Sequence, residues 1–135
     1  MVHKPLCEVM KGQPFCMVPL GADAPALAAV REGRLQPRDL ALLLVLIHNI
    51  EPLTGRCWLT TTELAAQLGH NQLRGVNQSI RRLRNEGLIA RGTDRHADRH
   101  SGRVRFWCVD PYTVACTGGA HRRAMQVAQF EAALQ

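Results

Sequence analysis

The sequence predicts a mainly helical α+β fold, and three observations favour it. The chain has 135 residues, which is the length of one ordinary domain. Apolar residues make up 46% of the chain and charged residues 21%, as in globular proteins. Several segments repeat apolar residues at helical spacing, whereas others are short and strand-like. We expect an N-terminal extension (1–36), a central domain (37–111), and a C-terminal loop and helix (112–135).

The N-terminal extension is expected to hold one short strand and one helix. Phe15–Val18 is a short apolar run between prolines and is suited to a strand. Ala24–Arg31 is alanine-rich and predicts a helix, with Asp23 as its N-cap. Gly33 is expected to end this helix.

The central domain begins with a strongly apolar helix, from Pro37 to about Asn49. Leu40, Leu43, Leu44 and Ile47 repeat at the spacing of one helical face, and further leucines widen that face. Because this helix is apolar nearly all round, we expect it at the centre of the core or at a subunit interface.

A short strand and a capped helix follow. Cys57–Leu59 suits a strand. Thr60 and Glu63 have the residue types and spacing of a capping box, which predicts a helix over residues 61–68. Gly69 is expected to end that helix.

The next helix is longer and lies one tight turn further on. Asn71 is the expected N-cap, and the helix should run to about Glu86, with Gly87 as its stop. Its apolar positions fall on one stripe, formed by Leu73, Val76, Ile80 and Leu83.

Two strands and a final helix complete the chain. Residues 88–91 and 103–109 are strand-like, and the polar residues 94–102 suit the tip of the hairpin between them. Residues 116–119 are expected to form a loop. Ala120–Leu134 predicts an amphipathic helix, and its expected apolar side consists of Ala124, Val127, Ala128, Phe130 and Leu134.

The predicted order is helix, short strand, helix, tight turn, helix and two-stranded hairpin. This is the order of a winged helix–turn–helix, in which the second helix of the pair enters the DNA major groove. The hairpin, or wing, would touch the flanking DNA backbone.

The distribution of charge agrees with a polyanionic partner. The formal net charge is +6, and residues 70–105 hold nine arginines but three acidic residues. This segment therefore carries the entire excess of positive charge. Arginine favours bidentate contacts with phosphate and with guanine. We expect double-stranded DNA as the partner and a homodimer on two half-sites.

The candidate DNA-binding residues form two groups. On the helix and the turn before it, the residues away from the apolar stripe are Asn71, Gln72, Arg74, Gly75, Gln78, Arg81, Arg82 and Asn85. In the wing, the candidates are Arg95, His96, Arg99, His100 and Arg103. Arginine, glutamine and asparagine are the side-chain types that read bases and position phosphates. Gly75 lowers helix propensity, which is explained if DNA must approach the backbone there.

Two sets of segments resemble known protein families. Residues 64–69 and 76–89 look like the DNA-reading core of bacterial winged-helix proteins. Residues 15–20, Val109-Asp110-Pro111 and the basic helix at 121–131 resemble small plasmid replication-initiation and maintenance proteins, with a departure at residues 115–118. This second resemblance implies replication initiation at a plasmid origin.

The sequence is also compatible with other functions. A small transcriptional repressor is the alternative, and Cys57, Cys108, Cys116 and His121 would make it metal- or thiol-responsive if they met in space. A protein-binding module with the same fold is another alternative. RNA ranks below duplex DNA, because single strands are usually bound on exposed aromatic side chains and only 4% of the residues are aromatic.

The same sequence argues against several functional classes of protein. It has neither a phosphate-binding loop with lysine nor a Gly-x-Ser-x-Gly motif, and Tyr112 lacks a histidine pair for strand nicking. The longest apolar run, Leu40–Ile47, is too short for a membrane span. Five cysteines without a Cys-x-x-Cys pair suggest reduced thiols. We expect a cytoplasmic protein without catalytic residues, cofactor or metal.

Overall fold

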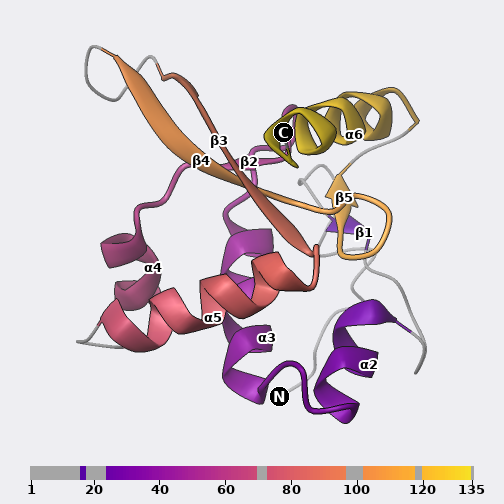
Figure 1. Ribbon diagram of the computed structural model, residues 1–135. Helices are drawn as coiled ribbons and strands as arrows, with labels where there is room; N and C mark the ends of the chain where they lie inside the picture. The colour runs from indigo at the N-terminus through magenta and orange to yellow at the C-terminus, as the bar shows by residue number, and fades with distance from the viewer. Residues whose placement is uncertain (1–15, 18–23, 70–72, 97–101, 118–119, 135) are drawn as a thin grey trace, which may run out of the picture.

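The computed structural model describes residues 16–17, 24–69, 73–96, 102–117 and 120–134. Within these residues the chain has five helices and two antiparallel sheets, so the predicted α+β class is confirmed (Figure 1). The helices are α2 (Pro25–Arg31), α3 (Pro37–His48), α4 (Thr61–Gln67), α5 (Leu73–Asn85) and α6 (Ala120–Leu134). The strands are β1 (Cys16–Met17), β2 (Arg56–Cys57), β3 (Ile89–Arg95), β4 (Arg103–Val109) and β5 (Cys116–Thr117).

The larger sheet has the strand order β2-β4-β3 and separates two packed layers. Its register pairs Arg91 with Trp107 and Gly92 with Phe106. Since side chains alternate along a strand, odd-numbered residues of β3 and β4 share one face and even-numbered residues share the other. Helices α3, α4 and α5 lie on the odd-numbered side, and α6 lies on the even-numbered side (Figure 1).

The main core lies between the odd-numbered face and the three central helices. Leu42 and Leu46 of α3, Leu64 of α4 and Leu83 of α5 are almost completely buried there. Trp107 closes the core from the sheet. The apolar helix at residues 37–49 thus lies at the core, which is one of its two expected positions, but Leu44 of the predicted face is 54% exposed. Burial of each such side chain contributes roughly 1.5–3 kcal/mol.

A second, smaller core lies on the other face of the sheet. Trp58, Phe106 and Cys108 pack there against Phe130 of α6. The buried Gln126 side chain of α6 lies over Gly55, where an added Cβ would be 2.8 Å from Gln126 Cγ. Phe130 therefore packs α6 on the sheet, and Gln126 packs it on the turn before β2.

The capping box predicted before α4 is confirmed. The Glu63 backbone N–H donates to Thr60 Oγ1 and the Thr60 backbone N–H donates to Glu63 Oε1, both at 3.1 Å. The helix ends at Gln67, and Gly69 follows with a φ of 73°, a backbone conformation that glycine adopts without strain.

Four local predictions are wrong. The N-cap of α2 is Ala24 rather than Asp23, and Leu73 is 41% exposed because it begins α5 away from the core. Part of the loop predicted at residues 116–119 is strand β5, which pairs with β1. In α6, the side chains of Ala124, Ala128 and Leu134 are exposed, and Gln126 takes an inner position instead.

Gly92 is a site where an added methyl group should be costly. Its ideal Cβ would lie 2.4 Å from Phe106 Cζ, because the Phe106 ring covers this residue across the strand pair. We expect Gly92→Ala to lower the free energy of unfolding by about 1–3 kcal/mol through overpacking, measured by urea denaturation. An unchanged unfolding midpoint would show that the ring moves without cost.

None of the helices in the described residues combines the length and apolar character required to cross a bilayer.

Candidate functional site

A groove of about 1170 Å³ lies between α5, the segment that leads into α4, and the β3–β4 hairpin. Five arginines and no acidic residue line it. The lining residues are Leu59, Thr60, Thr61, Thr62, Asn77, Ile80, Arg81, Arg84, Asn85, Arg91, Gly102, Arg103, Val104, Arg105 and Trp107. We call these five arginines (Arg81, Arg84, Arg91, Arg103 and Arg105) the groove arginines. A concave surface with one sign of charge concentrates counter-ions and charged ligands.

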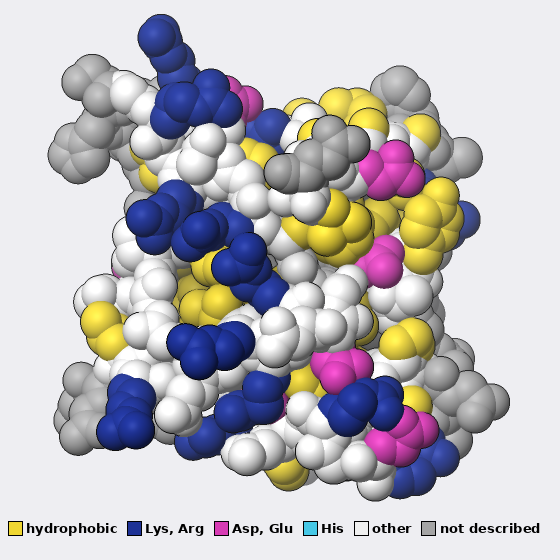
Figure 2. All heavy atoms as spheres, viewed as in Figure 1, with side chains coloured by type: hydrophobic (Ala, Val, Ile, Leu, Met, Phe, Trp, Pro, Cys, Tyr) yellow, Lys and Arg dark blue, Asp and Glu magenta, His cyan; other side chains and the backbone are white. Residues whose placement is uncertain are grey.

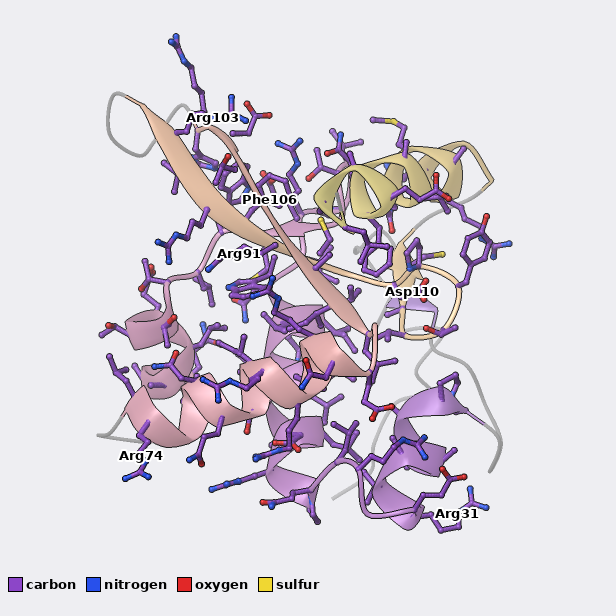
Figure 3. The ribbon with its side chains drawn as sticks, viewed as in Figure 1. Arg31, Arg74, Arg91, Arg103, Phe106 and Asp110 are labelled. Atoms are coloured by element: carbon purple, nitrogen blue, oxygen red, sulfur yellow. The ribbon has the colours of Figure 1, made fainter. Side chains whose placement is uncertain are left out.

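The register of the sheet places three of the groove arginines together. Arg91, Arg103 and Arg105 occupy odd-numbered positions, so their side chains leave the sheet on the side of α5. Arg81 and Arg84 are three residues apart on α5 and therefore share one helical face. In Figure 3, Arg103 extends from the outer part of the hairpin and Arg91 lies nearer its middle.

The basic surface is longer than the groove. Figure 2 shows Lys and Arg side chains along this side of the molecule, from the hairpin down to α5. Arg74 projects from the first turns of α5, at the end away from the hairpin's connection (Figure 3). The surface thus follows the hairpin and α5 as one basic band.

Most of the groove arginines have no carboxylate partner among the described residues. Within the described part of the chain, Arg81, Arg84, Arg91 and Arg105 form no ion pair. Arg103 instead donates to the Thr93 hydroxyl at 3.1 Å and to the Thr93 carbonyl. Neighbouring like charges repel one another, and an anion in the groove would relieve this repulsion.

The structure gives Arg82 an intramolecular role. Its Nε donates to Asp39 Oδ2 at 2.7 Å and its Nη2 to Asp39 Oδ1 at 2.9 Å, a bidentate pair between α5 and α3. The Asp39 side chain is completely buried, whereas that of Arg82 is 25% exposed. Sequence reasoning grouped Arg82 with Arg81 as a DNA contact, because a single-helix projection does not reveal that α3 covers one flank of α5.

Asp39 is ionised although it is buried. Burial alone would raise the pKa of its carboxyl group, but hydrogen bonds from Arg82, Ser79 and the Gln36 backbone outweigh burial and lower the pKa below its ordinary value. The Gln36 N–H bond, at 2.8 Å, also ties this carboxylate to the start of α3. The guanidinium of Arg82 is thus paired with the Asp39 carboxylate, which is not exposed to water.

Gln78 and Gly75 lie beside an arginine of α3. Arg38 Nη2 donates to Gln78 Oε1 at 3.3 Å, and Arg38 Nη1 is 3.8 Å from the position of an added Cβ on Gly75. Arg38, which sequence reasoning did not include, therefore extends the basic surface beside α5. Arg74 and Asn85 are exposed, as predicted.

The predicted hairpin residues separate into two faces. Arg95 and Arg103 are direct partners on the groove side, and both are exposed. His96 packs instead against Trp58, with ring centroids 4.6 Å apart. Arg99 and His100, like Asn71 and Gln72 before α5, lie outside the described residues.

Sequence reasoning missed several residues that line the groove. Arg84, Arg91 and Arg105 were counted in the charge total but not assigned to the site, and Asn77 and the threonines at 60–62 were not considered. The alternation of Arg103 and Arg105 was a usable signal, because residues two apart in a strand share a face. The contribution of Arg91 required the register between β3 and β4.

The cysteines offer little support for a sensor. Cys57, Cys108 and Cys116 are buried thiols that form no disulfide. Burial raises the pKa of the Cys108 thiol to about 11, so it is protonated at neutral pH and a poor nucleophile. Among the described residues, no three His, Cys, Asp or Glu side chains are placed to hold a metal ion; the side chain of His121 lies outside them.

Gly75 provides a test of the backbone conformation of α5. It has an ordinary helical backbone, and an added Cβ would make ordinary van der Waals contact with Arg38. We expect Gly75→Ala to stabilise the protein by ~0.5–1 kcal/mol in urea unfolding, because alanine has the higher helix propensity. A loss of stability would contradict this description of the backbone.

Comparison with protein-family models, with curated proteins and with solved structures finds no match. The evidence for function is therefore the geometry and charge of this surface.

Proposed function

We propose that this chain is a winged helix–turn–helix protein that binds double-stranded DNA in a sequence-specific manner. The order of α3, β2, α4, α5, β3 and β4 supports this proposal, as does the sheet order β2-β4-β3. In this assignment α4 and α5 are the helix–turn–helix pair, α5 is the recognition helix, and the β3–β4 hairpin is the wing.

The observation that carries the proposal is the groove with five arginines and no acid next to α5. A DNA backbone offers a row of phosphates, and arginine binds phosphate with two parallel hydrogen bonds. We assign Arg84, Arg91 and Arg105 to phosphates. Arg74, Gln78 and Arg81, which follow one flank of α5, are assigned to the major groove.

Duplex DNA is a better partner for this surface than single-stranded RNA. Proteins that bind single strands usually stack bases on exposed aromatic rings. Trp58, Trp107, Phe106 and Phe130 are buried, and Tyr112 is the one exposed aromatic side chain among the described residues. The basic band thus lacks the stacking surfaces that would favour RNA.

The proposed biological role is plasmid-type replication initiation in the cytoplasm, with a homodimer bound to repeated half-sites. The resemblance of residues 15–20, 109–111 and 121–131 to small plasmid replication proteins supports this role. A small transcriptional repressor is the alternative, since both use the same mode of DNA binding. The buried thiols make a thiol-responsive repressor the weaker form of that alternative.

The decisive experiment is selection of random duplex DNA by the full chain at two salt concentrations. An enriched motif whose retention falls steeply with salt is the expected result, because phosphate contacts release counter-ions. Tandem repeats in the motif would indicate replication initiation, and a single palindrome a repressor. Retention without enrichment would contradict sequence specificity, and no retention at low salt would contradict DNA binding itself.

A further inference from the structure

We propose that Arg56 is a positioning residue that holds the β3–β4 hairpin in its DNA-binding position by connecting it to α6. The inference rests on the proposed function, because it assigns a task to the side of the hairpin that faces away from DNA. Arg56 itself is not among the residues that line the groove.

Arg56 joins three separate parts of the fold. From its position in β2, its Nη1 donates to Asp94 Oδ2 of β3 at 2.8 Å. Its Nε donates to Gln129 Oε1 of α6 at 3.1 Å, and its Nη2 donates to the same oxygen. The Arg56 side chain is 13% exposed. These bonds form a clamp (Arg56, Asp94 and Gln129) that links the hairpin to α6.

Aromatic packing fixes the guanidinium within the clamp. Arg56 Cζ lies 4.2 Å from the centre of the Phe106 ring and 5.6 Å from that of Trp58. The Trp58 ring in turn contacts His96 at the outer end of β3. Cation–π contacts of this kind strengthen when the cation is removed from water. The clamp therefore supports both strands of the hairpin on its even-numbered face.

The outer half of the hairpin needs such support. Strand β2 pairs with Cys108 and Trp107, which are at the inner end of β4. Residues 92–95 and 103–106 consequently form a two-stranded ribbon in the described structure. A two-stranded ribbon alone is marginally stable in water. The same ribbon carries Arg95, Arg103 and Arg105 of the basic surface.

The clamp also removes an unfavourable charge from the DNA side. Asp94 is one of the three acidic residues in the basic segment 70–105, and its charge would oppose phosphate if it faced the DNA. In the structure its carboxylate is turned to the even-numbered face, where the hydrogen bond from Arg56 lowers the pKa of Asp94. Asp94 thus fixes the hairpin while the arginines face the groove.

The test compares Arg56→Met and Gln129→Ala with the intact chain, using duplex DNA carrying the selected motif. Methionine keeps much of the aliphatic volume but removes the clamp's cation. We expect Arg56→Met to lower affinity about tenfold and to reduce the salt slope by ~2, because Arg103 and Arg105, the groove arginines of the ribbon, would no longer hold two phosphates. Gln129→Ala should show a smaller change in the same direction, and Arg56→Lys should restore part of the slope.

Two further measurements separate positioning from general destabilisation. Binding is measured at a temperature where circular dichroism shows every variant fully folded, and amide hydrogen exchange of residues 92–95 and 103–106 should accelerate more than that of α5. If Arg56→Met does not fold, the salt slope and hairpin exchange are compared for Gln129→Ala and the intact chain. Unchanged salt slope and hairpin exchange in a folded variant would overturn the clamp. If the intact chain binds no DNA, the proposed function fails, and hairpin exchange still tests the clamp.

Discussion

Replacing Arg82 by methionine is expected to lower the free energy of unfolding by about 3 kcal/mol, because it leaves the buried Asp39 carboxylate without its cation. Removal of one partner of a buried pair commonly costs about 3–5 kcal/mol, and the partial exposure of Arg82 favours the lower end. Arg81→Ala, one residue away on the exposed side of α5, should change stability by less than ~0.5 kcal/mol. Urea denaturation of both variants measures this contrast.

The loss caused by Arg82→Met should depend on pH in a defined direction. In the intact protein the pKa of Asp39 is lowered, so its stabilising contribution is present above the unfolded-state pKa of about 3.9. That contribution is lost as the pH falls through the folded-state pKa. The variant lacks the part of this contribution that Arg82 supplies, so the difference in stability between the two proteins should be largest near neutral pH and shrink in acid.

A double variant provides the control. Adding Asp39→Asn to Arg82→Met removes the unpaired charge and should recover part of the lost stability, since an amide oxygen can still accept from the Gln36 N–H. The effect on DNA binding also distinguishes the two arginines, because Arg81 and not Arg82 is the proposed DNA contact. Arg81→Ala should weaken binding without loss of stability, and equal stability losses in both single variants would contradict the distinct roles of these neighbours.

Neutralising three groove arginines should have the largest effect on binding. We expect the triple variant Arg84→Ala, Arg91→Ala and Arg105→Ala to reduce the salt slope of DNA binding by about 3 and affinity by roughly 100-fold near ~0.1 M salt. Each arginine that leaves a phosphate reduces counter-ion release by nearly one ion. Because phosphates carry no sequence information, affinity for the selected motif and for unrelated duplex should fall by similar factors. Fluorescence anisotropy titrations over a range of salt measure both quantities.

The matched control removes positive charge from the other side of the sheet. Arg122 and Arg123 are exposed residues of α6, which packs on the face away from the groove. Their double replacement by alanine should change the salt slope far less per arginine than the groove variant. Similar losses per arginine in both variants would indicate a response to net charge and would argue against a groove that holds the DNA backbone.

Much of the fold could be predicted because its signals are local. The Thr60–Glu63 capping box needs four consecutive residues, and Gly69 and Gly87 end helices through their own backbone conformation. The alternation along residues 103–106 marks the outer half of β4 in the same way. The basic character of residues 70–105 is likewise a property of composition. These features determined which elements form and which part of the chain is basic.

The position of each polar side chain required the tertiary structure. Arg81 and Arg82 are adjacent and chemically identical, yet one lines the groove and the other is held by Asp39, 43 residues earlier in the chain. A helical projection cannot separate them, since it contains no information about the neighbouring helix. Arg91 joins the site only through its register with Trp107.

Helix α6 is a second case in which the sequence did not predict the position of polar side chains. Its extent was predicted, but its inner face was not, because Gln126 is buried over Gly55 and Gln129 accepts hydrogen bonds from Arg56. A polar side chain turns inward when the fold supplies a partner for it. The sequence by itself determined most of the elements and the basic character of residues 70–105, through interactions between residues a few positions apart. The tertiary structure decided which arginines are available to a ligand, since that depends on contacts between distant segments.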